Sequence, residues 1–188
     1  MNIKLTKNIL FFKKDKYKVF KIENYEDYKV NFDLDFYNKN FIESFDQFNK
    51  LGINDFTSFN LKFIEKLLNK KCVAFIIFNK NKLVHIRWIS LNLETHNIVD
   101  DIPFQKYLKN EKFGVWGNAY TDPNYRGLGF NKLSISKCMK YLKDNKIRFS
   151  FASVRSNNLV NINTYLKIKK YDIHHKLILR FLFFKVIF

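Results

Sequence analysis

Apolar residues recur along the chain at two different periods, and the change of period indicates where helices and strands alternate. Between residues 54 and 70 they lie three or four positions apart, which is typical of one buried helix face, whereas residues 147–154 alternate as in a strand. Two short apolar runs, 72–78 and 83–91, flank the polar residues 79–82 and predict a hairpin. In chain order the pattern predicts two strands joined by a short turn within 8–22, helices at 40–50 and 54–70, the hairpin, a strand at 113–122, a helix at 129–144, a strand at 147–154, a helix at 156–170 and a β-rich tail to residue 188, with residues 94–112 left open.

The order of these elements indicates the fold class. Strands come first as a meander and later alternate with helices, and this order favours an α/β fold built on a mixed sheet. The 188 residues, of which 47% are hydrophobic, are enough to bury a real core, and the sequence shows no repeat or low-complexity linker. We therefore expect one domain over residues 1–188.

The chain carries a formal net charge of +17, from 34 Lys and Arg against 17 Asp and Glu. Such a charge suits a polyanionic partner, and the alternatives are a nucleic acid, an anionic membrane surface and a phosphate-rich small molecule. A compositional bias towards Lys, Asn, Ile and Phe also explains it, because the lysines are spread over the whole length. The 10 Tyr and 22 Phe follow the core periodicity, so no nucleic acid is expected as a partner. A non-catalytic basic protein that binds nucleic acid or a membrane surface is the alternative function.

No segment of the sequence indicates export or a membrane span. The apolar runs fall short of the roughly 20 residues that cross a bilayer, and the N-terminus lacks an apolar core followed by small residues, so we expect a cytoplasmic protein. Cys72 and Cys138 are expected to be buried thiols, and no metal is expected because no Cys/His cluster has ligand spacing. The apolar tail LILRFLFFKVIF is interpreted as a core strand or a homodimer strand, with membrane-surface contact as the alternative.

The stretch DPNYRGLGFNK, residues 122–132, concentrates the scarce backbone freedom of the chain. The sequence holds only 5 Gly and 2 Pro, yet Pro123, Gly127 and Gly129 fall together here, between a predicted strand and a predicted helix. Glycines let a backbone approach a phosphate, a helix N-terminus offers unpaired N–H groups, and nearby basic side chains add positive charge. The spacing matches neither a P-loop nor the dinucleotide fingerprint. By spacing alone, a structural turn and a phosphate site are equally good interpretations.

In its context this stretch resembles the acetyl-coenzyme A binding segment of the Gcn5-related N-acetyltransferase (GNAT) superfamily. That segment is a strand, a turn of the form x-P-x-x-R-G-x-G-x-G/A and a helix. The matching residues are Pro123, Arg126, Gly127 and Gly129. Asn131 stands where the family has Gly or Ala, and its side chain is expected either to crowd the turn or to place an amide near the phosphates.

A second segment, SNNLVNINTYLKIKKYDI, resembles the family element N-x-x-S/A-x-x-x-Y-x-x-x-G-F. Asn158 takes the Asn position and Tyr165 the Tyr position, while Asn161 stands where Ser or Ala is common. Lys169 and Lys170 replace the Gly-Phe pair, and this departure leaves room for a non-catalytic member of the family. Together the two segments cover about the last 75 residues, and the rest of the chain matches the family only in the order of its elements.

The resemblance implies a single-domain α/β fold with a mixed, mostly antiparallel sheet that is flanked by helices and splayed at its central strand. The acyl-CoA-binding half would span about residues 113–188. Acetyl-CoA would be the co-substrate, and its acyl group would pass directly to an amine while Tyr165 acts as general acid on the leaving thiolate. The cofactor-binding residues that it implies are Ala119, Tyr120 and Thr121 for the pantetheine arm and thioester, Arg126, Gly127, Leu128, Gly129, Phe130, Asn131 and Lys132 for the pyrophosphate, and Asn158 for the CoA arm.

The acceptor side of the reaction is less constrained by the sequence. Tyr165 also fits an ordinary packing position on an amphipathic helix. His85 and Asn118 are candidate substrate-binding residues, although a lone His in a strand is more often structural. The general base stays open among solvent water and the side chains of His85, Glu94, His96, Asp100 and Asp101, while His174 and His175 are interpreted as structural.

The positive charge argues for a small, anionic amine acceptor, because polyamines and lysine tails would be repelled. The two segments together also look like bacterial acyltransferases of surface-polysaccharide pathways. We therefore expect an amino sugar, which would be nucleotide-linked, as the acceptor.

Overall fold

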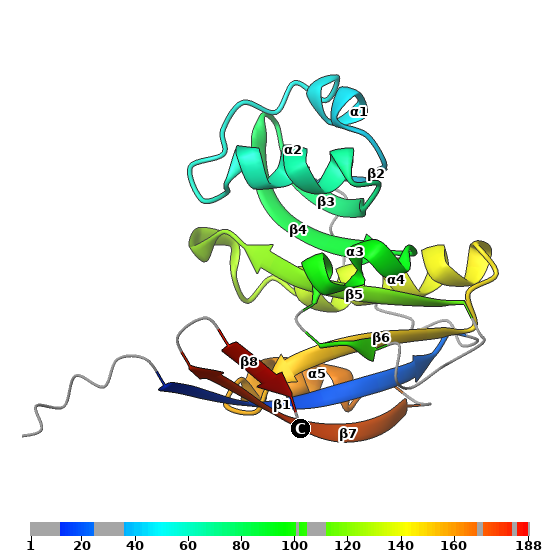
Figure 1. Cartoon of the computed structure of the whole chain (residues 1–188). Coiled ribbons are helices and arrows are strands. Elements are labelled where there is room, and N and C mark those ends of the chain that lie inside the picture. Colours follow the sequence, from blue (N-terminus) through cyan, green and yellow to red (C-terminus); the bar gives the residue numbers. More distant parts are fainter. Residues whose placement is uncertain are drawn as a thin grey trace, which may run out of the picture.

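The computed structural model describes residues 12–24, 36–100, 102–104, 112–168, 171–181 and 184–187. Figure 1 shows its strands and helices, which are β1 (Phe12–Glu23), β2 (Asn38–Ile42), α1 (Phe45–Asn49), α2 (Leu61–Asn69), β3 (Val73–Asn79), β4 (Lys82–Ser90), α3 (Leu93–Val99), β5 (Phe113–Thr121), α4 (Phe130–Asp144), β6 (Phe149–Arg155), α5 (Leu159–Tyr165), β7 (Tyr171–Phe181) and β8 (Phe184–Ile187).

The strands form one sheet in the order β2-β3-β4-β5-β6-β1-β7-β8. Neighbouring strands pair antiparallel except β5 and β6, which run parallel. These two strands pair only between residues 113–115 and 149–151, and their ribbons diverge beyond that point (Figure 1). The expected α/β fold, with a mostly antiparallel sheet that is flanked by helices and splayed at its centre, is confirmed.

Apolar clusters lie on both faces of the sheet, because successive strand residues point to opposite sides. One cluster packs α1, α2 and α3 against the sheet around Trp88 and includes Cys72. The other packs α4 and α5 around Trp116 and includes Cys138. Both cysteines are buried free thiols, as predicted, and burial raises the pKa of Cys138 to about 12. Neither thiol is therefore expected to react readily at neutral pH.

The N-terminal part of the fold differs from its prediction. Residues 12–23 form one strand, β1, instead of two strands and a turn, while residues 8–11 lie outside the described residues. The polar run KKDK, residues 13–16, does not interrupt this strand. It continues the strand because β1 pairs with β7 through this run, and the exposed Lys16 alternates with the buried Tyr17 and Val19.

The two predicted N-terminal helices are shorter than expected. Residues 40–50 hold the end of β2 and only a brief α1. The helix predicted at 54–70 begins as α2 after Asn60, whose side chain caps it. Asn54 lies outside this helix, accepts a hydrogen bond from Nδ2 of Asn81 at 2.6 Å and is held against the β3–β4 hairpin.

The later elements follow the prediction more closely. The hairpin β3–β4, strand β5, helix α4 and strand β6 lie within a few residues of their expected limits. The open region 94–112 contains α3, the helix expected at 156–170 covers only α5, and the β-rich tail is two paired strands, β7 and β8, in the same sheet. Among the described residues, no helix is long and apolar enough to cross a membrane.

His96, on α3, should make the fold sensitive to acid. Its ring packs 4.7 Å from the ring of Phe113, neither ring nitrogen has a hydrogen-bond partner among the described residues, and burial lowers the pKa of His96 to about 4. The folded pKa lies below the unfolded value of about 6.5, so the unfolded state binds more protons and stability falls as pH drops from 6.5 towards 4. Between pH 7 and pH 5 we expect this residue to cost about 2 kcal/mol of unfolding free energy.

Urea unfolding of the wild type and His96→Phe at both pH values measures this loss. The variant should lose about 2 kcal/mol less than the wild type between pH 7 and pH 5. His175→Gln is the matched control, because His175 is exposed on β7 and should leave the loss unchanged. An equal loss in the wild type and in His96→Phe would contradict the prediction.

Candidate functional site

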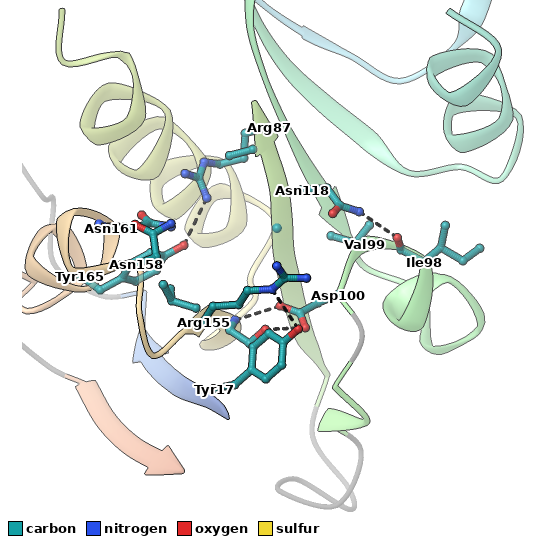
Figure 2. Close-up of a pocket in the computed structure, with 14 residues that line it drawn as sticks. Tyr17, Arg87, Ile98, Val99, Asp100, Asn118, Arg155, Asn158, Asn161 and Tyr165 are labelled. Carbon is teal, nitrogen blue, oxygen red and sulfur yellow. Dashed lines mark hydrogen bonds between the residues drawn. The ribbon is translucent and has the colours of Figure 1, made fainter. Parts of the chain in front are cut away.

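A cleft opens where β5 and β6 separate. Its volume is about 420 Å³, and it is lined from both strands and from α3 and α5 (Figure 2). The lining side chains with polar or charged groups are Tyr17, Arg87, Asp100, Asn118, Ser153, Arg155, Asn158, Asn161 and Tyr165. The cleft therefore lies at the splayed centre of the sheet.

A bulge in β5 opens the backbone towards this cleft. The pairing of β5 with β4 shifts register between Ile86 and Trp88, opposite residues 117–120. Asn118 takes a positive φ of 43°, and its Nδ2 donates to the carbonyl of Ile98 at 3.0 Å. Bulges leave backbone groups without ladder partners. The bulge thus leaves strand N–H and C=O groups that a ligand in the cleft can use.

Asp122 anchors the turn that follows β5. This residue is 1% exposed, and its carboxylate accepts hydrogen bonds from Ser58 Oγ at 2.8 Å and from the Asn124 N–H at 2.9 Å. Lys82 Nζ lies 3.2 Å from the same carboxylate. These contacts attach the turn to the loop before α2, to β4 and to its own first residues, so the glycines beyond it are held in place.

The two glycines of the turn adopt left-handed backbone conformations. Gly127 has a φ of 84° and Gly129 a φ of 83°. Side chains with a Cβ rarely take such values, which explains why glycines stand at these two positions. Gly129 is also the N-cap of α4, and it offers no side chain to the first-turn N–H groups of that helix.

The uncapped start of α4 stands out among the helices of the described residues. In α1, α2, α3 and α5 a Ser or Asn side chain accepts a hydrogen bond from the first turn. The start of α4, residues 129–132, instead lines a second cavity of about 530 Å³. It is lined by Ala119, Tyr120, Thr121, Tyr125, Arg126, Gly127, Gly129, Phe130, Asn131, Lys132, Asn158, Val160, Asn161 and Thr164. A helix N-terminus beside two cationic side chains, here Arg126 and Lys132, is suited to binding an anion.

Figure 2 shows Tyr165 in the first cavity, opposite strand β5. Its ring stacks on Phe20 with centroids 4.8 Å apart, so the packing interpretation holds for the ring. Its hydroxyl accepts a hydrogen bond from Nη1 of Arg87 at 3.2 Å and lines the cleft. Burial raises the pKa of Tyr165, and the charge of Arg87 acts in the opposite direction. The residue therefore combines a packed ring with a protonated hydroxyl at the cleft floor.

Three asparagines of the two sequence segments, Asn131, Asn158 and Asn161, are joined by hydrogen bonds. Asn131 Nδ2 donates to Asn161 Oδ1 at 3.0 Å. The Asn161 N–H in turn donates to Asn158 Oδ1 at 3.1 Å, so Asn158 is the N-cap of α5. Asn158 lines both cavities. Because its Oδ1 caps α5, its Nδ2 is the atom that would donate a hydrogen bond to a ligand.

Sequence reasoning missed Arg87. This residue of β4 is only 1% exposed, and its Nε donates to Ser134 Oγ at 2.9 Å. The signal was an arginine inside the β-rich run LVHIRW, at a position that alternation places on the inner face beside His85. A fully buried arginine is rare unless it is paired, so an arginine at an inward strand position is an unusual feature.

The sequence profile of the Acetyltransferase (GNAT) family matches residues 24–169. This chain belongs to the GNAT family. Members of this family use acetyl-CoA as the donor of an acetyl group. A search of curated proteins found no match.

Solved structures show the same GNAT fold. One similar structure is an acetyltransferase of the family from Colwellia psychrerythraea, with a TM-score of 0.57 and 14% identity over 91% of this chain and 57% of that chain. A Drosophila protein from a structural genomics programme has a TM-score of 0.59 and 10% identity over 91% of this chain and 52% of that chain. Identities this low show the fold alone, and this chain spans little more than half the length of either protein.

The two predicted substrate-binding residues of this GNAT chain differ in their accessibility. His85 is fully buried, its Nδ1 lies 2.7 Å from Thr121 Oγ1, and burial and the Arg87 charge hold the pKa of His85 well below its usual range. It lines neither cavity, so the structure does not bring it to the candidate site, and a contact with substrate stays a prediction. Asn118, in contrast, lines the first cavity.

The candidate bases are also sorted by the structure. Asp100 lines the first cavity, whereas His96 is buried and Glu94 is exposed at the start of α3. Asp101 lies outside the described residues, as do Lys169 and Lys170. Among the described candidates, the geometry therefore favours Asp100 for contact with an acceptor.

Proposed function

We propose that this GNAT protein transfers an acetyl group from acetyl-CoA to the amine of a small anionic acceptor. One observation carries the proposal: the uncapped start of α4, the bulge of β5 and the hydroxyl of Tyr165 line two cavities that share Ala119, Asn158 and Asn161. A long ligand can therefore reach from the second cavity, the phosphate-type site at the start of α4, to the cleft between the splayed strands β5 and β6. Neither nucleic-acid nor membrane binding requires this arrangement.

Each part of the two cavities then has a task in the reaction. The N–H groups at the start of α4, with Arg126 and Lys132, hold the pyrophosphate of acetyl-CoA. Backbone N–H groups at the bulge, around Ala119, polarise the thioester carbonyl as an oxyanion hole does. The Tyr165 oxygen already accepts from Arg87, so its own proton is free to be donated into the cleft to the leaving sulfur.

The acceptor end of the cleft carries both signs of charge. Asp100 accepts hydrogen bonds from the N–H and Oγ of Ser153 at 2.9 and 2.7 Å, which fix its carboxylate. Arg155 lies beside it, with Nε 3.4 Å from Tyr17 Oη (Figure 2). A carboxylate suits the acceptor amine and an arginine suits a phosphate or carboxylate on the same molecule. A phosphate-linked amino sugar has both groups.

A panel of acceptors tests this function. Release of CoA from acetyl-CoA is followed with a thiol reagent in the presence of glucosamine 6-phosphate, glucosamine, a nucleotide-linked amino sugar and spermidine. Glucosamine and its phosphate form a matched pair that differs only in the anionic group. We expect faster release with the phosphorylated amines than with glucosamine, and the slowest release with spermidine. A preference for spermidine would overturn the acceptor class, and no release with any primary amine would overturn N-acetyl transfer.

Asp100→Asn should raise the KM for the acceptor by about tenfold or more, because a charge-assisted hydrogen bond to the amine is lost. The Kd for acetyl-CoA should stay within about twofold, since Asp100 lines only the first cavity. Steady-state kinetics with both substrates varied gives the two constants. Ser153→Ala is the control, because it removes one hydrogen bond from Asp100 and no charge. An equal rise in KM for both variants would show that Asp100 acts only through structure.

A further inference from the structure

Arg87 is a buried cation, and its hydrogen bonds within the described part of the chain all go to neutral groups. Its three nitrogens donate to Ser134 Oγ at 2.9 Å, to Tyr165 Oη at 3.2 Å and to Asn131 Oδ1. No carboxylate of the described residues forms an ion pair with it, although the side chain is 1% exposed. A buried charge without a counter-charge is costly. Such a charge is expected where a bound anion completes the pair.

Two residues that depart from the family pattern form the hydrogen-bond network that holds the Arg87 side chain in place. Asn131 stands where Gly or Ala is usual, and Asn161 stands where Ser or Ala is common. Asn131 Nδ2 donates a hydrogen bond to Asn161 Oδ1 at 3.0 Å, and Asn131 Oδ1 accepts a hydrogen bond from Nη2 of Arg87. The amide of Asn131 is thus turned inward, to the arginine and to α5, and not only towards the phosphate-type cavity. These two asparagines and Ser134 fix the guanidinium beside Tyr165.

We propose that Arg87 and the Tyr165 hydroxyl form an anion site for the sulfur of CoA as it becomes a thiolate. The proposal rests on the proposed function and assigns a ligand to the cleft floor. The cation is bonded to the hydroxyl that serves as the acid, so both groups can face the same leaving atom (Figure 2). A second cation of the cleft, Arg155, lies at the acceptor end beside Tyr17 and is assigned to the acceptor.

The charges balance through the step. The acceptor nitrogen bonds to the acyl carbon, the C–S bond breaks, and its electron pair stays on sulfur. Tyr165 gives its phenolic proton to this sulfur, and the surplus proton of the new ammonium group leaves to solvent. Arg87 offsets the negative charge first on the sulfur and then on the phenolate, until the phenolate regains a proton from solvent.

Calorimetric binding of CoA and acetyl-CoA between pH 6 and pH 9 tests this site. A free thiol titrates near pH 8.5, and a site that prefers the thiolate lowers the pKa of the bound thiol, so the affinity for CoA should rise with pH. We expect a rise of roughly tenfold or more across this range, and none for acetyl-CoA, which has the same phosphates but no thiol. Arg87→Met should abolish the rise. Asn131→Asp should abolish it too, because an isosteric carboxylate then neutralises Arg87.

Arg155→Met is the matched control and should keep the rise, since it removes a cleft arginine from the acceptor end. Thermal melting of each variant confirms that it is folded. A flat CoA profile in the wild type, or a rise that persists in Arg87→Met, would overturn the proposal. Tighter binding of succinyl-CoA than acetyl-CoA that depends on Arg87, together with a flat CoA profile, would assign the site to a carboxylate and also overturn it. Failure of acetyl-CoA to bind at every pH would instead overturn the proposed function.

Discussion

Replacing Tyr165 with Phe is expected to lower kcat for acetyl transfer by about 100-fold or more while the Kd for acetyl-CoA stays within about twofold. The phenyl ring keeps its stack on Phe20, so the fold and the cleft wall remain. Only the hydroxyl is lost, and with it the proton that the leaving sulfur would take. Single-turnover kinetics at saturating acetyl-CoA and calorimetry of acetyl-CoA binding give the two numbers separately.

Tyr141→Phe is the matched control for this loss. Tyr141 lies on α4, and its hydroxyl donates to Glu43 at 2.8 Å, outside both cavities. Removing that hydroxyl should leave kcat unchanged. If Tyr165→Phe keeps kcat within about threefold of the wild type, Tyr165 is a packing residue and the general-acid role is wrong.

Gly129→Glu should weaken acetyl-CoA binding by about 100-fold or more. The substitution forces a side chain into a backbone with a φ of 83° at the N-cap of α4 and adds a negative charge where the pyrophosphate would lie. Both effects act against the phosphate-type site, whereas the core beneath α4 is untouched. Calorimetric titration with acetyl-CoA measures the loss.

Gly52→Glu offers the same change away from the site. Gly52 also has a positive φ, 67°, and a Cβ built on it would meet no atom within 4 Å. Backbone strain and net charge therefore change alike in the two variants, and only position differs. Equal acetyl-CoA affinity in both variants would contradict a phosphate site at the start of α4.

The second half of the fold could be predicted from sequence because its signals are local. The glycine turn, the apolar period of α4 and the alternation of β6 each fix an element within a few residues, and the resemblance to the GNAT family joined them in the right order. Tyr165 and Asn158 were found in the same way. The structure places both on the wall of the cleft, and their roles stay proposals.

The first half was predicted less well because its signals are not local. The strand β1 contains a run of charges that would end an isolated strand, but β7 pairs with β1 through this run, and β6 pairs with the rest of the strand from Tyr17 onward. Arg87 could not be predicted as a site residue, because its contacts with Ser134 on α4 and Tyr165 on α5 exist only once the chain has folded. His85 was proposed as a contact to substrate because its complete burial, away from the lining of both cavities, cannot be deduced from the sequence.

Thermal melting with acetyl-CoA, CoA or ATP at moderate salt tests most directly whether the cleft and the turn form an acyl-CoA site. A ligand at roughly 100 times its Kd adds about 2.7 kcal/mol to the unfolding free energy, which corresponds to a shift of several degrees. We expect such a shift with acetyl-CoA and CoA, little with ATP, and none of it in Gly129→Glu. No shift with acetyl-CoA, or an equal shift with all three ligands, would contradict the acyl-CoA site.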